Sequence, residues 1–154
     1  MIWAYPGDAA YAPLVSFLTQ RIWGRDVAMS PGTALGITHG ETVSAVVLFH
    51  NYDPDAGVIE ISAASDSKRW LTRPVLRAIF GYAFNGLRCQ AVVARTDQAS
   101  VARIFTAYGF QRFDLPRLRG RNKGETVLIL GDDDWRANGF HKDYDDGQEG
   151  TNAD

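Results

Sequence analysis

Residues 57–83 read GVIEISAASDSKRWLTRPVLRAIFGYA, and this stretch decides the fold that the sequence predicts. A β-rich apolar run with one acid, Glu60, passes through a polar, basic corner at residues 65–69 into a strongly helical segment. Unpaired backbone N–H groups and the positive end of the helix dipole meet at such a corner, so it favours an anion. The stretch therefore predicts a strand that feeds a helix N-terminus at a phosphate-binding site.

Hydrophobic periodicity and turn residues divide the remaining chain into further elements. The predicted elements are a strand at 1–5, a helix capped by Asp8 and stopped by Gly24, strands at 34–39, 42–50 and 58–64, a helix at 74–84, a strand at 87–95, a helix at 98–108, and strands at 110–118 and 126–130. Strand, helix and strand between residues 58 and 95 indicate a right-handed crossover between parallel strands. The order implies an α/β domain with one mixed sheet covered by helices.

Charge is distributed unevenly along the 154 residues. The chain carries a net charge of −2, but residues 131–154 hold eight acids against two bases, which leaves the remainder of the chain positive. A mildly basic body suits an anionic ligand, whereas the acidic segment is typical of a solvated tail. We therefore expect one domain over residues 1–131 and a disordered C-terminal tail over residues 132–154.

Composition excludes several classes of protein. No apolar run is long enough for a membrane span, and the N-terminus lacks a signal-peptide pattern, which predicts a soluble cytoplasmic protein. The single cysteine, Cys89, cannot form an internal disulfide and is interpreted as a buried thiol, and no Cys/His spacing suggests a metal. The positive charge of the body is too small to predict nucleic acid as a principal partner.

The order of elements, together with residues 98–110 (QASVARIFTAYGF), resembles the GNAT superfamily of N-acetyltransferases. Residues 98–110 are similar to the helix that in this family begins at an Asn and ends at Gly-Phe, and Gln98 occupies the Asn position. Glu60-Ile61-Ser62-Ala63 resembles the Glu-Ile-Gly-Tyr of members similar to the ribosomal-protein acetyltransferases. Residues 70–110 also resemble short GNAT-like proteins of bacteriophages.

The resemblance implies a mostly antiparallel mixed sheet of about seven strands, with acetyl-CoA as donor and a primary amine as acceptor. The thioester would lie where two strands separate, beside residues 62–64 and 92–94. The implied cofactor-binding residues are Ser62, Ala63, Ala64, Lys68, Arg69, Trp70, Leu71, Thr72, Arg73 and Gln98. Two interpretations of Trp70 stay open: its ring stacks on the adenine of the cofactor, or it fills the space that a pyrophosphate would use.

The corner departs from the family pattern at its glycines. The two glycine positions fall on Leu71 and Arg73, or on Thr72 and Pro74 if the register shifts by one residue. Side chains hinder close approach of backbone to phosphate, and a proline lacks an N–H donor. Guanidinium and ammonium groups bind phosphate directly, so Lys68, Arg69 and Arg73 are candidates to compensate.

Candidate catalytic residues are Glu60 and Tyr108. Glu60 would accept a proton from the amine through a water, although the alternation of the strand equally allows a solvated surface carboxylate. The position at which many family members carry an acidic tyrosine is Phe105, which has no proton to give, and Tyr108 lies three residues further on. His50 and Asn51, at the end of a strand, are candidates to contact the acceptor, or a surface pair without a role.

The sequence thus predicts an N-acetyltransferase acting on an amine of a protein or small molecule. The alternative is a GNAT-like fold that has lost catalysis and serves as a structural or binding component of a bacteriophage particle, in which case the location is the virion. The exposed final strands make a homodimer or an assembly contact a further expectation.

Overall fold

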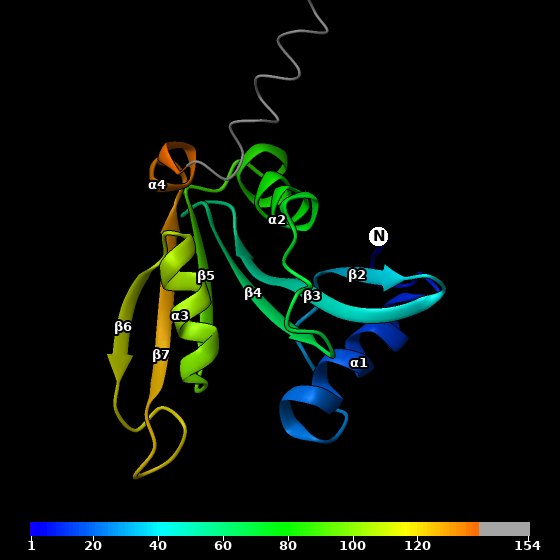
Figure 1. Cartoon of the computed structure of the whole chain (residues 1–154), viewed down its shortest axis with the longest axis horizontal. Coiled ribbons are helices and arrows are strands. Elements are labelled where there is room, and N and C mark those ends of the chain that lie inside the picture. The colour runs from blue at the N-terminus through cyan, green and yellow to red at the C-terminus, as the bar shows by residue number, and fades with distance from the viewer. Residues whose placement is uncertain (139–154) are drawn as a thin grey trace, which may run out of the picture.

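The computed structural model describes residues 1–138, and its centre is one seven-stranded sheet (Figure 1). The strands are β1 (Ile2–Ala4), β2 (Thr33–His39), β3 (Thr42–Asp53), β4 (Val58–Ser65), β5 (Ala91–Thr96), β6 (Gln111–Leu115) and β7 (Glu125–Gly131). Their order in the sheet is β1-β2-β3-β4-β5-β7-β6. Only β4 and β5 run parallel, and every other neighbouring pair is antiparallel. The predicted mixed, mostly antiparallel sheet is confirmed.

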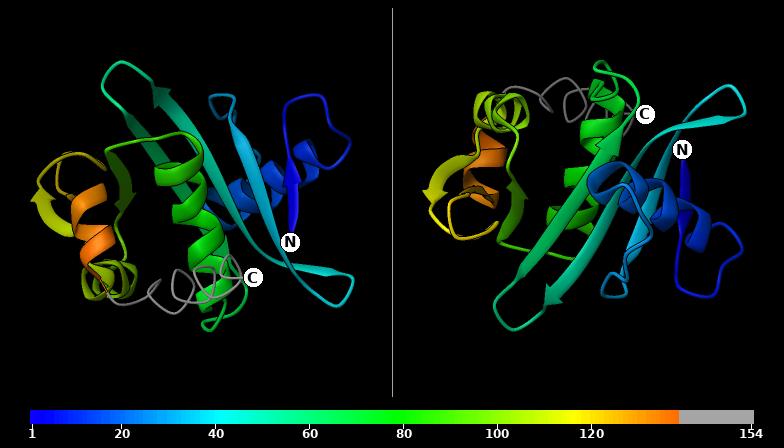
Figure 2. Two further views of the ribbon diagram at one scale, coloured as in Figure 1. Left: turned by 90° about the horizontal axis from the view of Figure 1, so that it is seen from above. Right: turned by 90° about the horizontal axis from the view of Figure 1, so that it is seen from below.

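Helices cover both faces of this sheet. They are α1 (Tyr11–Trp23), α2 (Arg73–Phe80), the π-helix η1 (Gly81–Gly86), α3 (Ala99–Tyr108) and α4 (Asp132–Ala137). Helix α1 and helix α2 lie on opposite sides of β2, β3 and β4 (Figure 2). None of the helices in residues 1–138 has the length and apolarity needed to cross a bilayer.

Two apolar cores follow from the alternation of the strands. On the face of α1, Leu14 and Leu18 pack with Val46 and Leu48 of β3. On the opposite face a larger core joins the strands to α2, η1, α3 and α4, with Phe80 fully buried at its centre. Because successive strand residues point to opposite faces, Phe49 and Ile61 belong to the second core while their neighbours His50 and Glu60 face the side of α1. We call this side the α1 face.

The start of α1 and the end of the second predicted helix differ from the prediction. Gly24 ends α1 in the left-handed region at φ 72°, as predicted. Asp8, however, does not cap the helix: its carboxylate accepts a hydrogen bond from Tyr5 N–H at 2.8 Å, and the helix begins three residues later. The second predicted helix is one continuous segment whose last six residues are a π-helix, in which Leu87 N–H donates to Tyr82 O at 2.8 Å.

The expected boundary between domain and tail is corrected by α4. Residues 132–137 are helical, and Trp135 is buried against Phe84 with ring centroids 5.1 Å apart. The three aspartates at 132–134, which suggested a solvated tail, occupy the first turn, where negative charge stabilises a helix. The described domain therefore extends to residue 138, and the expectation of disorder for residues 139–154 lies outside the described residues.

Candidate active site

The parallel pair β4 and β5 separates part-way along its length. The pairing begins at Val58 with Ala91 and ends at Ile61 with Ala94. Beyond that point β4 continues to pair with β3 as far as Ser65, and β5 continues to pair with β7 as far as Thr96 (Figure 1). The edge of β4 at residues 62–65 therefore has no β5 partner. On β4 the separation begins at Ser62, as the family resemblance implied, but on β5 it begins only after Ala94, because residues 92–94 are still paired.

A polar cluster lies on β3 and β4 beside this separation. His50 is opposite Glu60 in the antiparallel register, and both side chains face the α1 side. His50 Nε2 lies 2.8 Å from Ser62 Oγ and 3.2 Å from Glu60 Oε2. The Glu60 carboxylate and the Ser62 hydroxyl thus both lie within contact distance of His50 Nε2.

Two polar side chains lie on the other side of the His50 ring. Ser30 Oγ donates to Asn51 Oδ1 at 2.9 Å and lies 3.3 Å from His50 Nδ1. With its own proton on Asn51, Ser30 Oγ can accept from an Nδ1–H, whereas a proton on Nε2 would be donated to the Glu60 carboxylate. Nε2 is the ring nitrogen that faces Ser62 and Glu60.

Burial and charge act in opposite directions on His50. The side chain is 4% exposed, and this burial lowers the pKa of His50 below its usual value, while the Glu60 carboxylate pulls that pKa upward. Burial is the larger effect. Burial thus favours neutral His50 beside Glu60, whose side chain is 21% exposed and reachable from solvent.

Ser30 was not singled out in the sequence, where residues 30–32 were interpreted only as a loop. Gly32 lets this loop approach β3, since a Cβ at that position would lie 1.8 Å from Phe49 O. The Ser-Pro-Gly sequence was the available signal, because a glycine permits such close contact between backbones. Asn51 adopts a left-handed conformation at φ 52°, and its amide oxygen accepts the bond from Ser30.

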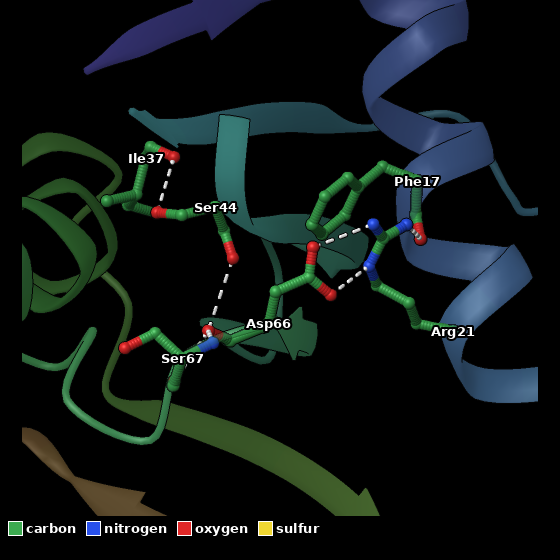
Figure 3. A network of polar contacts seen from close by, with 7 residues as sticks. Phe17, Arg21, Ile37, Ser44, Asp66 and Ser67 are labelled. Atoms are coloured by element: carbon green, nitrogen blue, oxygen red, sulfur yellow. Dashed lines mark hydrogen bonds and ion pairs between the residues drawn. The ribbon is translucent and has the colours of Figure 1, made fainter. Parts of the chain in front are cut away.

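The predicted phosphate corner follows β4 and is closed largely by its own polar groups (Figure 3). Asp66 forms a two-point ion pair with Arg21 of α1, at 2.7 and 2.8 Å, and its N–H donates to Ser44 O at 2.9 Å. Ser65 Oγ donates to Ser67 O at 2.7 Å and accepts from Ser67 N–H. The Arg21 guanidinium lowers the pKa of Asp66, so a carboxylate stays charged at the corner.

The N-terminus of α2 has few N–H groups left for a ligand. Thr72 is the N-cap: its own N–H donates to Trp70 O, and its side chain accepts from Val75 N–H at 3.4 Å. Leu76 N–H donates to Thr72 O, and Pro74 has no N–H. Pro74, Val75 and Leu76 thus offer no N–H group to a pyrophosphate, whereas the exposed side chains of Lys68 and Arg69 provide positive charge beside the helix.

The remaining predicted residues do not join the polar cluster. Trp70 and Leu71 are half-buried against the larger core, which favours the space-filling reading of Trp70. Gln98 is the N-cap of α3, without a side-chain capping bond. Tyr108 is buried on the face of the sheet opposite to Glu60: it stacks on Phe80 with centroids 4.8 Å apart.

The Tyr108 hydroxyl accepts a hydrogen bond from Trp135 Nε1 at 3.1 Å. Burial raises the pKa of Tyr108 to about 12. The structure therefore does not bring the two expected catalytic residues together, and Tyr108 lies in the core.

The seven-stranded order, the single parallel pair and its separation are those of a GNAT-like fold. Solved structures with this fold include a putative acetyltransferase from T. thermophilus, with 18% identity, TM-score 0.57, and 68% of this chain and 61% of that chain covered. A point mutant of the spermidine N-acetyltransferase SpeG from Vibrio cholerae has 9% identity and TM-score 0.59, with 70% of this chain and 68% of that chain covered.

A chimera of SpeG from Vibrio cholerae and hSSAT has 7% identity and TM-score 0.68, with 90% of this chain and 100% of that chain covered. No protein-family model and no curated protein matches the chain. At these identities the likeness shows the fold.

Proposed function

We propose that the chain is an N-acetyltransferase that moves an acetyl group from acetyl-CoA to a primary amine of a protein or small molecule. The observation that carries the proposal is the cluster of His50, Glu60 and Ser62 on the α1 face, directly beside the point where β4 leaves β5. Structural neighbours named as acetyltransferases, including spermidine N-acetyltransferases, support the same activity.

Glu60 is the group that receives the proton. When bound, acetyl-CoA supplies an activated acetyl thioester. As the new N–C bond forms, the amine must lose one proton, and the partly exposed Glu60 carboxylate accepts it directly or through a water. His50 Nε2, 3.2 Å away, can take this proton in turn when the ring carries its own proton on Nδ1. In that tautomer Ser30 Oγ, 3.3 Å from Nδ1, accepts from the ring, and Ser62 Oγ lies 2.8 Å from Nε2.

Donor binding is divided between two parts of the chain. The edge of β4 at residues 62–64 has backbone groups without a β5 partner, which suits the amides of the pantetheine arm. The phosphates would be held by Lys68, Arg69 and Arg73, because Pro74 has no N–H group and those of Thr72, Val75 and Leu76 are already bonded.

The test combines binding and turnover. We expect wild type to bind acetyl-CoA by calorimetry, and the double variant Lys68→Gln/Arg69→Gln to bind about tenfold or more weakly, because a charge-assisted hydrogen bond contributes about 1.5–3 kcal/mol. Glu60→Gln should leave binding intact and lower kcat by about 10²-fold or more in an amine screen, since a base is lost. Glu41→Gln, at the exposed β2–β3 turn, is the matched control. Full turnover in Glu60→Gln would remove Glu60 from the mechanism.

A second candidate is a GNAT-fold protein without catalysis, acting as a structural or binding component, for example in a bacteriophage particle. The closed corner favours it, because Asp66 is already paired with Arg21, and the N–H groups of Thr72, Val75 and Leu76 are bonded within the chain. No binding of acetyl-CoA at millimolar concentration would support this candidate and exclude the first.

A further inference from the structure

A buried carboxylate holds two arginines near the separated end of β5. The Glu125 side chain is fully buried, and its two oxygens each accept a hydrogen bond at 2.5 Å, one from Arg95 Nε and the other from Arg119 Nε. The arginine side chains are 47% and 27% exposed. A buried carboxylate is costly unless paired, so this arrangement fixes two guanidinium groups at one place on the surface.

The terminal nitrogens of both arginines remain available. Within residues 1–138, the side-chain hydrogen bonds of Arg95 and Arg119 are the two Nε bonds to Glu125. Asp97 lies close by, but Lys123 binds it at 3.0 Å, and this hydrogen bond is the main reason that its pKa is lowered. Three cations and two carboxylates thus leave a local charge of +1, with planar donors free to bind an oxyanion.

Strand geometry places Arg95 on the same face as Glu60. Ala94 is the last β5 residue paired with β4, so Arg95 is the first beyond the separation. Val93 lies directly opposite Glu60, and Arg95, two residues further along β5, points to the same face. A strand spacing of about 4.8 Å and a rise of about 3.3 Å per residue put the Cα atoms of Glu60 and Arg95 roughly 8 Å apart.

The sheet surface beside them is apolar and partly open. Val93, Val127 and Ile129 alternate on the α1 face of β5 and β7 and are half-buried, whereas Val92, Leu128 and Leu130 on the other face are buried. Helix α1 packs on β2, β3 and β4 of this face. A small molecule can therefore lie over Val93, beside Val127 and Ile129, with one end at Glu60 and the other at Arg95.

We propose that Arg95 and Arg119 bind an oxyanion of the acceptor, so that the preferred substrate is a primary amine that also carries a carboxylate or a phosphate a few bonds from its nitrogen. This rests on the proposed acetyl transfer for the role of the amine, but the oxyanion site itself does not need catalysis. Glu125 is a positioning residue that orients the two guanidinium groups.

The test measures anion binding directly. The ¹⁵N-labelled full chain is titrated with β-alanine and with β-alaninamide, which differ in the negative charge, and with phosphoethanolamine and ethanolamine, while the Nε–H signals of Arg95 and Arg119 are followed by NMR. We expect both signals to move with the charged member of at least one pair, and its Kd to be about tenfold or more below that of its neutral partner. Comparing the pairs distinguishes a carboxylate from a phosphate.

Variants separate recognition from folding. Arg95→Lys and Arg119→Lys keep a cation for Glu125 but lose the planar fork, and either should remove most of the selectivity for the charged member. Arg112→Gln, which loses an exposed arginine bound to Asp114 on β6, should retain that selectivity. Turnover assays of the same compounds with acetyl-CoA should show the same ratio in kcat/KM.

Equal binding of the charged and neutral members would overturn the proposal, as would selectivity that survives in both lysine variants. So would movement of the two arginine signals by acetyl-CoA alone, because the pair would then belong to the donor. Selective binding without acetyl transfer would leave the oxyanion site standing and exclude the proposed enzyme. Acetyl transfer without selectivity for the charged compounds would support the proposed enzyme and exclude the oxyanion site.

Discussion

Replacing Glu125 by Gln tests the arrangement on which the two arginines depend. The change keeps the volume of the side chain but removes the charge that Arg95 and Arg119 share. Two guanidinium groups would then face one neutral amide, and the amide NH₂ can accept no hydrogen bond from either of them.

The size of the effect follows from the exposure of the partners. Losing one member of a buried ion pair costs about 3–5 kcal/mol. Arg95 is half exposed and can return to water, whereas Arg119 is 27% exposed and carries most of the loss, so we expect the lower end, about 3 kcal/mol. For a chain of this length that corresponds to a fall in Tm of about 6–12 °C, measured by circular dichroism.

Asp114→Asn is the control on the neighbouring strand. Asp114 also binds an arginine and accepts a hydrogen bond from Thr126 at 2.7 Å, but its side chain is 65% exposed. We expect a much smaller change in Tm for this variant, since water replaces the lost contacts. An equal fall in both variants would refute the argument that burial makes Glu125 the anchor of the arginine pair.

Three further results are expected. Tyr108→Phe should lower the free energy of unfolding by about 1–3 kcal/mol, because Trp135 Nε1 loses its acceptor, and should leave kcat unchanged; a large fall in kcat would restore Tyr108 as the acid. Since burial holds the pKa of His50 below its usual 6.5, the unfolded chain binds the proton first, so Tm should fall as the pH drops below about 6.5; an unchanged slope in His50→Gln would contradict this. Thr72→Ala should cost about 1 kcal/mol in denaturant unfolding through loss of the Val75 cap, and an unchanged midpoint would show the cap to be ineffective.

Much of the fold could be predicted because local chemistry determined it. The Gly40-Glu41 turn, the stop at Gly24 and the strand–helix–strand passage from residue 58 to 96 all follow from turn residues and periodicity. Helix α4 was missed because three consecutive aspartates look solvated in sequence. Helix α4 belongs to the domain because Trp135 is buried against Phe84, and these two residues are 51 positions apart in the chain.

The candidate site was predicted less completely, since its contacts cross between elements. Glu60 and His50 were selected separately, and only the β3–β4 register shows that they meet. Tyr108 was a candidate because it lies three residues beyond Phe105 on the predicted helix, whereas its stacking on Phe80 puts it in the opposite core. Arg95, Arg119 and Glu125 had no shared motif, because two strands and a turn had to bring them together.

Sequence by itself therefore determined the order of elements and the presence of a charged corner at residues 65–73, because these depend on neighbours in the chain. Only the tertiary structure decided what the corner can bind. Arg21 reaches Asp66 across 45 positions and Thr72 uses the N–H of Val75, so groups that look available in sequence are already bonded. Satisfaction of polar groups depends on packing in space, which the order of residues along the chain does not contain.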